Sequence, residues 1–332
     1  MAWFNQSKKR SAGYTISAQL ADLLTDGVNL SIDELIPYQN KTSLVNLAPK
    51  QALHGQMSGN YLARSKGRGM EFDEVRHYQS GDDIRTIDWR VTARTGITHT
   101  KLFREEVERP VIIATDLNHT MFFGSQLLFK SVQAAHLAAL LAWHSKKRGD
   151  RVGGIVFNEE KHLEIKPRSR QEGVLHYLHA LTQIHQTPCQ PLDKAQALLA
   201  FEQNCARLRQ VSKPGSLVYL ITDGYQLNDS CIRHLSLISQ HCELVVCLVS
   251  DPLEHQLPTQ IKPTTVAVTD GYAQQTITLG DKKSALKYQQ LSANNSAQKS
   301  LLLSKAGARI LTLSAASSLE QQIKDGATQW IR

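Results

Sequence analysis

The sequence lacks the features that would mark a membrane protein, a secreted protein or a nucleotide hydrolase. No run of about 18 apolar residues occurs in the 332-residue chain, so no membrane span is expected. The N-terminal residues contain no apolar core of the signal-peptide type, which favours a cytoplasmic location. There is no glycine-rich loop of the form GxxxxGKS or GxxxxGKT, so the chain is not expected to hydrolyse ATP by itself.

Cysteine is scarce and is not arranged for disulfides or for zinc. The five cysteines are odd in number and form no CxxC pair, so we expect buried or incidental thiols in a reducing compartment. Neither a zinc site nor a disulfide framework is therefore predicted. The cysteines are Cys189, Cys205, Cys231, Cys242 and Cys247.

Nucleic acid is not expected as a partner, although the formal net charge is +8. Residues 64–109 hold ten Lys or Arg and nine Asp or Glu, so their charges nearly cancel. The positive excess is spread over the rest of the chain. No basic stripe with interleaved aromatic residues occurs, which is the pattern that a nucleic-acid surface would need.

From about residue 99 onward, strand-like and helix-like segments alternate. This alternation predicts right-handed βαβ units and a mostly parallel, doubly wound α/β sheet with helices on both faces. In such sheets, ligands bind beyond the carboxyl ends of the strands. Strands are expected at 111–116, 151–158, 215–225, 242–251 and 308–315, with a small β pair at 264–271 and 275–280. Helices are expected at 125–150, 170–184, 192–209, 229–241 and 284–307.

The N-terminal third of the chain differs from this α/β part. Residues 1–60 contain short helical segments with too little apolar surface to fold alone, so we expect them to pack on another part of the chain. Residues 61–109 form a highly charged, partly β block. Residues 99–110 are expected to be an edge strand that leads into the strand at 111–116. The remaining residues, 110–332, form the α/β domain.

Two of the predicted strands end in an acidic residue with other oxygen-bearing side chains beside it. Asp116 is followed at alternate positions by Asn118 and Thr120, and a later strand ends in Thr222 and Asp223. Because Mg²⁺ prefers oxygen ligands, these side chains are candidate ligands of a cation at one edge of the sheet. Asp, Asn and Thr at strand ends also commonly cap the next helix or bond to loop amides, so a purely structural role is the alternative.

The spacing Asp116-x-Asn118-x-Thr120, with the later Asp223, resembles the metal-ion-dependent adhesion site of von Willebrand factor type A domains. In that family the first strand ends in Asp-x-Ser-x-Ser, and later loops supply a Thr and an Asp. Asp116 and Asp223 match this pattern, whereas Asn118 and Thr120 replace serines, and Thr187 is the nearest counterpart of the middle threonine. The resemblance implies a Rossmann-like, von Willebrand A-type sheet with a weak or vestigial Mg²⁺ site.

The charged block carries a second resemblance, to the bacterial family called domain of unknown function 58. In that family such a block precedes a von Willebrand A-like domain, and the resemblance spans about residues 55–250. The family's genes commonly lie beside those of MoxR-type AAA+ ATPases. The resemblance therefore implies a non-catalytic adaptor or protein–protein interaction protein that works with such an ATPase on an unknown client. The matching positions are Gly69, Phe72, Arg76, Tyr78, Gly81, Asp82, Asp83, Arg85, Ile87, Asp88, Trp89, Ala93, Arg94, Lys101, Phe103 and Glu105.

Three roles are open for the charged block. Paired Arg and Asp side chains could fix a loop-rich plug against the sheet, with a short helix or turn at 84–94 whose Trp89 packs inward. Alternatively, its arginines could receive acidic groups of a partner. The third role is catalysis by Asp82 and Asp83, although adjacent residues usually point apart and make a poor acid–base pair. The candidate partner-binding residues are Arg76, Tyr78, Asp82, Asp83, Arg85, Asp88, Trp89 and Arg94.

An enzyme is the alternative to an interaction protein. Asp116-x-Asn118-x-Thr120 also resembles the first motif of haloacid-dehalogenase-type phosphatases, Asp-x-Asp-x-Thr, in which the first Asp is the nucleophile and the second the general acid. Thr222 would then stand for that family's second motif. Because Asn118 cannot act as an acid, and no clear lysine or paired-aspartate motif follows, we expect no catalytic residue. A purely structural scaffold is the remaining alternative.

Overall fold

The computed structural model describes residues 16–44, 70–105, 108–187, 192–259, 262, 264–269 and 274–326. Gly69 and Cys189, which the sequence singled out, lie outside them. The chain divides into two compact units. The larger unit comprises Met1–Lys50 and Arg109–Arg332, and the smaller unit comprises Gln51–Glu108.

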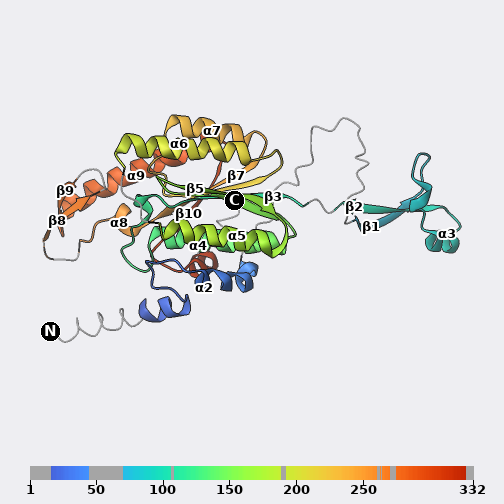
Figure 1. The fold of residues 1–332 in the computed structure, drawn as a ribbon, viewed down its shortest axis with the longest axis horizontal. Coiled ribbons are helices and arrows are strands. Elements are labelled where there is room, and N and C mark those ends of the chain that lie inside the picture. The colour runs from blue at the N-terminus through green and yellow to red at the C-terminus, as the bar shows by residue number, and fades with distance from the viewer. Residues whose placement is uncertain are drawn as a thin grey trace. The chain divides into compact units, whose positions relative to one another are not determined.

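A six-stranded sheet forms the centre of the larger unit (Figure 1). The strand order is β10-β7-β6-β3-β4-β5, with β5 antiparallel to β4 and the other neighbouring pairs parallel. The predicted α/β fold with a mostly parallel sheet is therefore confirmed. The strands are β3 (Pro110–Asp116), β4 (Arg151–Phe157), β5 (His162–Arg168), β6 (Leu217–Thr222), β7 (Glu243–Ser250) and β10 (Arg309–Ser314).

The sheet reverses its direction of growth at β3. The chain passes from β3 to β4 on one side, and β6 later pairs with β3 on the other side. This is a topological switch point, and sheets of this type bind ligands beyond the carboxyl ends of their strands at such a point. Both predicted acidic strand ends lie at this edge.

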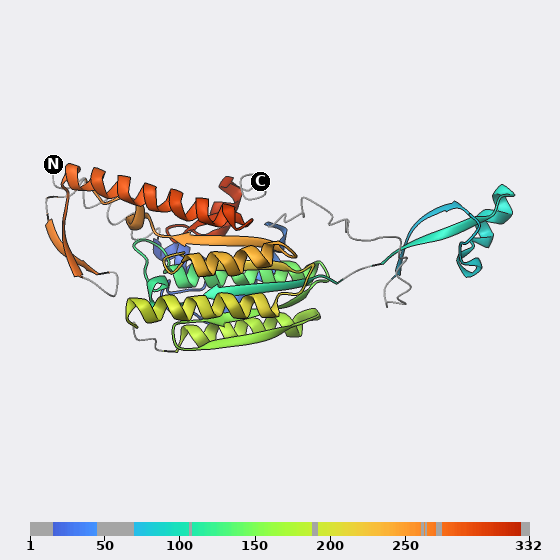
Figure 2. The ribbon, with the colours of Figure 1, turned by 90° about the horizontal axis from the view of Figure 1, so that it is seen from above.

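Helices cover both faces of the sheet (Figures 1 and 2). Alternate side chains of β3 pack on opposite faces: Ile113 joins the apolar cluster that contains α4 and α5, and Ile112 and Ala114 join the cluster that contains α6 and α7. Asp116 continues the second set because side chains alternate along a strand. The first face carries α4 (Lys130–Lys147), α5 (Arg170–His185) and α10 (Leu319–Gly326), and the second carries α6 (Lys194–Val211), α7 (Asp229–Ser239) and α9 (Lys282–Lys305).

The N-terminal segment packs on α4, as expected for a segment that cannot fold alone. It contains α2 (Ile32–Leu35) and the 3-10 helix η1 (Ile36–Leu44), and the Trp143 indole donates a hydrogen bond to the Leu35 carbonyl oxygen at 3.2 Å. Fifteen of the 18 residues of α4 are buried. A helix is buried all round when it is covered on both sides, here by the sheet and by the N-terminal segment.

Gly27 joins this segment to the loop that precedes α4. Its carbonyl oxygen accepts a hydrogen bond from the Phe129 amide at 2.8 Å, its φ is +82°, and a Cβ there would lie 2.6 Å from the Leu127 carbonyl oxygen. We expect Gly27→Ala to lower the free energy of unfolding in urea by about 2–4 kcal/mol, through backbone strain and the clash together. Gly215→Ala is the control, because Gly215 has the same φ but open space around it. Equal losses in the two variants would contradict the close contact.

The smaller unit is built on an antiparallel pair, β1 (Met70–His77) and β2 (His99–Glu105). The strand predicted at 99–110 is confirmed for residues 99–105, but it does not join the sheet that contains β3, because β2 pairs with β1 and β3 lies between β4 and β6. Period-2 patterning shows that a strand exists but does not name its partner. The predicted short helix or turn at 84–94 is confirmed by η2 (Ile84–Thr86) and α3 (Trp89–Thr95).

The larger unit also contains shorter elements near the carboxyl ends of its parallel strands and beside α9. In Figure 2 a small hairpin lies at the amino-terminal end of α9. Within the described residues, no helix combines the length and the apolar character needed to cross a membrane. The shorter elements are η3 (His119–Met121), α8 (Pro252–His255), β8 (Thr264–Thr269) and β9 (Gln274–Leu279).

Candidate functional site

The carboxyl ends of β3 and β6 bring Asp116 and Thr222 together. Thr115 pairs with Ile221, so the next residues along the two strands lie side by side on the face that carries α6 and α7. The Thr222 hydroxyl donates a hydrogen bond to Asp116 Oδ2 at 2.6 Å, and both side chains are fully buried. Two residues that are 106 positions apart in the sequence thus lie in direct contact at the edge of the sheet; this pair is called the Asp116 corner of the site.

The loop after β3 folds back on Asp116. The Asn118 amide donates to Asp116 Oδ1 at 3.0 Å, and Gln226 Nε2 donates to the Thr120 hydroxyl at 3.5 Å. Asn118 precedes η3, yet its side chain makes no capping hydrogen bond. The buried Oδ1 and Nδ2 of Asn118 have no partner among the described residues. Since a buried amide without partners is costly, this side chain is suited to a bound group rather than to a helix cap.

Asp223, one residue beyond β6, is bonded to a lysine that the sequence analysis did not single out. Lys130 Nζ lies 2.9 Å from Asp223 Oδ2 and 2.6 Å from Glu254 Oε1. The side chains of Lys130 and Asp223 are each 1% exposed. Lys130 is the first residue of α4, where the helix dipole disfavours a cation. That unfavourable placement is the one signal in the sequence that could have pointed to it.

A second ammonium group flanks Asp223. Lys299 of α9 donates to the Asp223 carbonyl oxygen at 3.1 Å, and its Nζ lies 3.8 Å from the centroid of the Tyr225 ring. Lys130 Nζ lies 5.2 Å from the same ring. Both lysines therefore lie within the range of a cation–π contact with Tyr225, beside the Asp223 corner.

The two aspartates of the site have opposite pKa shifts. Burial, followed by the negative charge of Asp223, raises the pKa of Asp116 to about 8. Burial also acts to raise the pKa of Asp223, but the charge of Lys130 and its hydrogen bond outweigh that effect and lower it. In the protein without a bound cation, Asp223 is therefore ionised at neutral pH and Asp116 is largely protonated.

Thr187, the remaining predicted ligand, is engaged elsewhere. Its hydroxyl donates to the Gln183 carbonyl oxygen at 2.8 Å, which satisfies the end of α5. The donors that do converge at the edge are carboxylate, amide and hydroxyl oxygens, the type that Mg²⁺ prefers. Within the described ranges, no three His, Cys, Asp or Glu side chains form a metal-binding cluster. A cation at this edge would therefore depend on Asn118 and Thr120 as well.

In the smaller unit, the predicted partner-binding acids make local contacts. Asp82 is paired with Arg76 at 2.8 Å, and the Tyr78 hydroxyl donates to the Asp82 carbonyl oxygen at 3.1 Å. Asp83 accepts from the Arg85 amide at 3.0 Å, and the Asp88 carboxylate caps α3. These contacts hold the turns of the block in place.

Trp89 and two arginines of the same block face solvent. The prediction that Trp89 packs inward is wrong, because the residue is 67% exposed. A two-stranded sheet with one short helix has too little apolar surface to bury an indole. Arg85 and Arg94 are also exposed. These exposed residues belong to the smaller unit, whereas Asp116 belongs to the larger unit.

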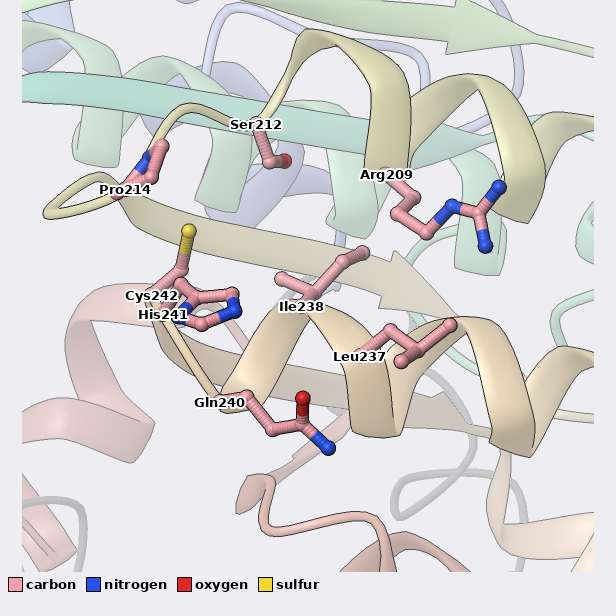
Figure 3. A pocket seen from close by; sticks show the side chains of 8 residues that line it. All are labelled: Arg209, Ser212, Pro214, Leu237, Ile238, Gln240, His241 and Cys242. Carbon is pink, nitrogen blue, oxygen red and sulfur yellow. The ribbon is translucent and has the colours of Figure 1, made fainter.

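A pocket of about 270 Å³ lies between α6 and α7, near the amino ends of β6 and β7. Figure 3 shows Leu237 and Ile238 on α7 and Arg209 on α6, facing the space between the two helices. None of the predicted site residues lines it. The lining residues are Arg209, Ser212, Pro214, Leu237, Ile238, Gln240, His241 and Cys242.

The fold and the site define an α/β protein with polar residues at the switch point of a mostly parallel sheet. The family described as protein of unknown function DUF58 matches residues 74–299, which is more than half of the chain. The chain belongs to this family.

Two relatives and two solved structures resemble the chain over most of its length. Uncharacterized proteins of Mycobacterium bovis and Mycobacterium tuberculosis are each 27% identical over 215 residues, which is 64% of this chain and 65% of theirs. The chain thus covers slightly less than two thirds of the length of these relatives.

Among solved structures, the conserved hypothetical protein BatB from Bacteroides thetaiotaomicron has a TM-score of 0.38 at 14% identity. An aerotolerance-related membrane protein from Bacteroides fragilis has a TM-score of 0.40 at 16% identity. Each match covers 67% of this chain and 98% of the other.

Proposed function

We propose that this protein is a non-catalytic adaptor that works with a MoxR-type AAA+ ATPase on a client protein, and that its larger unit is a von Willebrand A-like domain. The observation that carries the proposal is the convergence of Asp116, Asn118 and Thr120 with Asp223 at one edge of the sheet. The edge is a topological switch point, where sheets of this type bind ligands. An acidic group of a partner is the ligand that such a site would receive through a cation.

The oxygen donors at this edge fit a weakly held Mg²⁺. Asn118 Oδ1 is a buried acceptor with no described partner, and the charges of Asp116 and Asp223 repel each other, as the raised pKa of Asp116 indicates. Asp116, Asn118, Thr120 and Asp223 would hold the ion, which would keep a position open for a carboxylate of the partner. The affinity is expected to be low because Lys130 already neutralises Asp223.

We place a second contact region on the smaller unit, at Arg85, Trp89 and Arg94. Exposed Trp and Arg side chains are the types that most often carry binding energy at protein interfaces. Arginine also forms two parallel hydrogen bonds with a carboxylate. This region is suited to an acidic segment of the ATPase or of the client.

Titration of Mg²⁺ or Mn²⁺ into the purified chain by calorimetry tests the cation site. We expect binding in the micromolar to low-millimolar range, and a loss of at least about tenfold in affinity in Asp116→Ala. Asp229→Ala, at an exposed position at the start of α7, is the matched control and should bind like the natural chain. An absence of heat with a folded natural chain would make the site vestigial and leave Arg85–Arg94 as the binding surface.

Binding to the nucleotide-free MoxR-type ATPase of the same organism tests the adaptor role. We expect complex formation that weakens with a chelator and with Asp116→Ala.

A phosphatase assay with p-nitrophenyl phosphate tests the enzymatic alternative. Turnover that disappears in Asp116→Ala would favour the haloacid-dehalogenase-like mechanism and overturn the non-catalytic assignment.

A further inference from the structure

Lys130 forms a buried ionic triad with Asp223 and Glu254. Its ammonium lies between two carboxylates, 2.9 Å from the first and 2.6 Å from the second. We propose that the Lys130 ammonium competes with the divalent cation for the Asp223 carboxylate. When Asp223 binds the cation, Glu254 keeps the ammonium paired. This inference rests on the proposed function only in taking Asp223 as a ligand of that cation.

Both carboxylate oxygens of Asp223 already accept a hydrogen bond while Lys130 is in place. Oδ2 accepts from Lys130, and Oδ1 accepts from the Tyr225 amide at 3.1 Å. A divalent cation beside Asp223 would also be repelled by the ammonium, and the repulsion is strong because both groups are shielded from water. Binding of the cation therefore requires the Lys130–Asp223 contact to weaken.

Glu254 is held in a position where it can keep the Lys130 ammonium paired after the Lys130–Asp223 contact weakens. Its second oxygen, Oε2, accepts from the Asp251 amide at 3.0 Å, so the carboxylate is held by the capping box of α8. Asp251 in turn accepts from the Ser125 amide and hydroxyl at 2.8 and 2.6 Å, in the loop that leads to Lys130. The start of α4 and the start of α8 are thus tied together by two carboxylates. A lysine released from Asp223 would stay paired rather than remain as an isolated buried charge.

The charges around Asp223 explain why the natural site is expected to be weak. Lys130 pairs with both Asp223 and Glu254, and Lys299 donates to the Asp223 carbonyl oxygen, so two ammonium groups offset the two negative charges of Asp223 and Glu254. Removing one of the two lysines should therefore strengthen a cation site, and removing Glu254 should weaken it. The two substitutions have opposite signs although they break the same ion pair.

The test is calorimetric titration of Mg²⁺ into the full chain and its variants, with the Mg²⁺-induced rise in Tm as a second measurement. We expect Lys130→Met to bind Mg²⁺ at least about tenfold more tightly than the natural chain. Glu254→Gln should bind it at least about threefold more weakly, because the ammonium then rests on Asp223 alone. Lys41→Met and Glu320→Gln, which remove the two sides of an ion pair between η1 and α10, are the matched controls and should leave the affinity unchanged.

Opposite shifts in the two variants cannot arise from general loss of structure, so they support the inference. Mg²⁺ binding by Lys130→Met supports the inference even if the natural chain binds none, because Lys130 would then block the site completely. Unchanged or weakened binding in Lys130→Met overturns the inference; if the natural chain still binds Mg²⁺, the proposed cation site survives. If neither binds, both fail. Lys130→Gln, which retains a hydrogen-bond donor without the charge, repeats the test should the methionine variant not fold.

Discussion

Asparagine in place of Asp116 is expected to make the larger unit more stable than the natural protein at pH 8, by a clearly larger margin than at pH 5, when no divalent cation is present. Burial and the charge of Asp223 raise the pKa of the folded Asp116 carboxyl to about 8. The unfolded chain releases this proton near the ordinary value of about 4. Between these values the folded state holds more protons than the unfolded state, so stability falls as the pH rises.

The measurement is the free energy of unfolding in urea, taken with a chelator from pH 5 to pH 9. The natural chain should lose at least about 1 kcal/mol more than Asp116→Asn over this range, because one unit of pKa shift corresponds to about 1.4 kcal/mol. Asp281→Asn is the control: hydrogen bonds from Ser284 lower the pKa of this helix-capping carboxyl, so its contribution changes only in acid. Parallel profiles for the natural chain and Asp116→Asn would show that Asp116 does not hold a proton in the folded state.

Leu35→Ala is expected to destabilise the larger unit by about 2–5 kcal/mol, the range for a leucine removed from a packed core. Leu35 is 0% exposed, and its backbone carbonyl oxygen accepts a hydrogen bond from the Trp143 indole of α4. Ile36→Ala, at the neighbouring residue that is 41% exposed, is the control and should cost well under half as much. The measurement is urea unfolding followed by tryptophan fluorescence, for which Trp143 at the contact is a direct reporter.

The outcome of that comparison bears on the role of the N-terminal segment. If both substitutions cost little, the segment is an appendage of the α/β unit. If Leu35→Ala causes the expected loss, residues 16–44 are part of its core, because they cover the side of α4 that the sheet leaves open.

Local patterns of the sequence were sufficient to predict the fold and two corners of the site. Apolar runs at 111–116 and 217–222 predict buried strands, and the alternation with helices predicts that they run parallel. Parallel strands place their carboxyl ends at one edge, so Asp116 and Asp223 were expected near each other before any contact was known. The pairing of Asp116 with Thr222 follows from the same argument.

Other features depend on contacts between distant parts of the chain, and local patterns do not contain them. Strand β5, which the sequence analysis did not predict, is an edge strand in which half-buried and exposed residues alternate without a continuous apolar run. Strand β2 was recognised as a strand, but its partner, β1, was not. Trp89 was expected in a core because tryptophan side chains are usually buried. It is exposed because its small unit has too little apolar surface to cover an indole.

The sequence by itself determined the class of fold and the acidic strand ends, since both follow from periodicity along a few residues and from the geometry of parallel sheets. Only the tertiary structure decided that Lys130, 93 residues before Asp223, places its ammonium against that carboxylate, and that Glu254 shares it. A lysine at the start of a helix has many solvent-exposed arrangements open to it. The packing of α4 between the sheet and the N-terminal segment removes them, and the two carboxylates then fix where the charge lies.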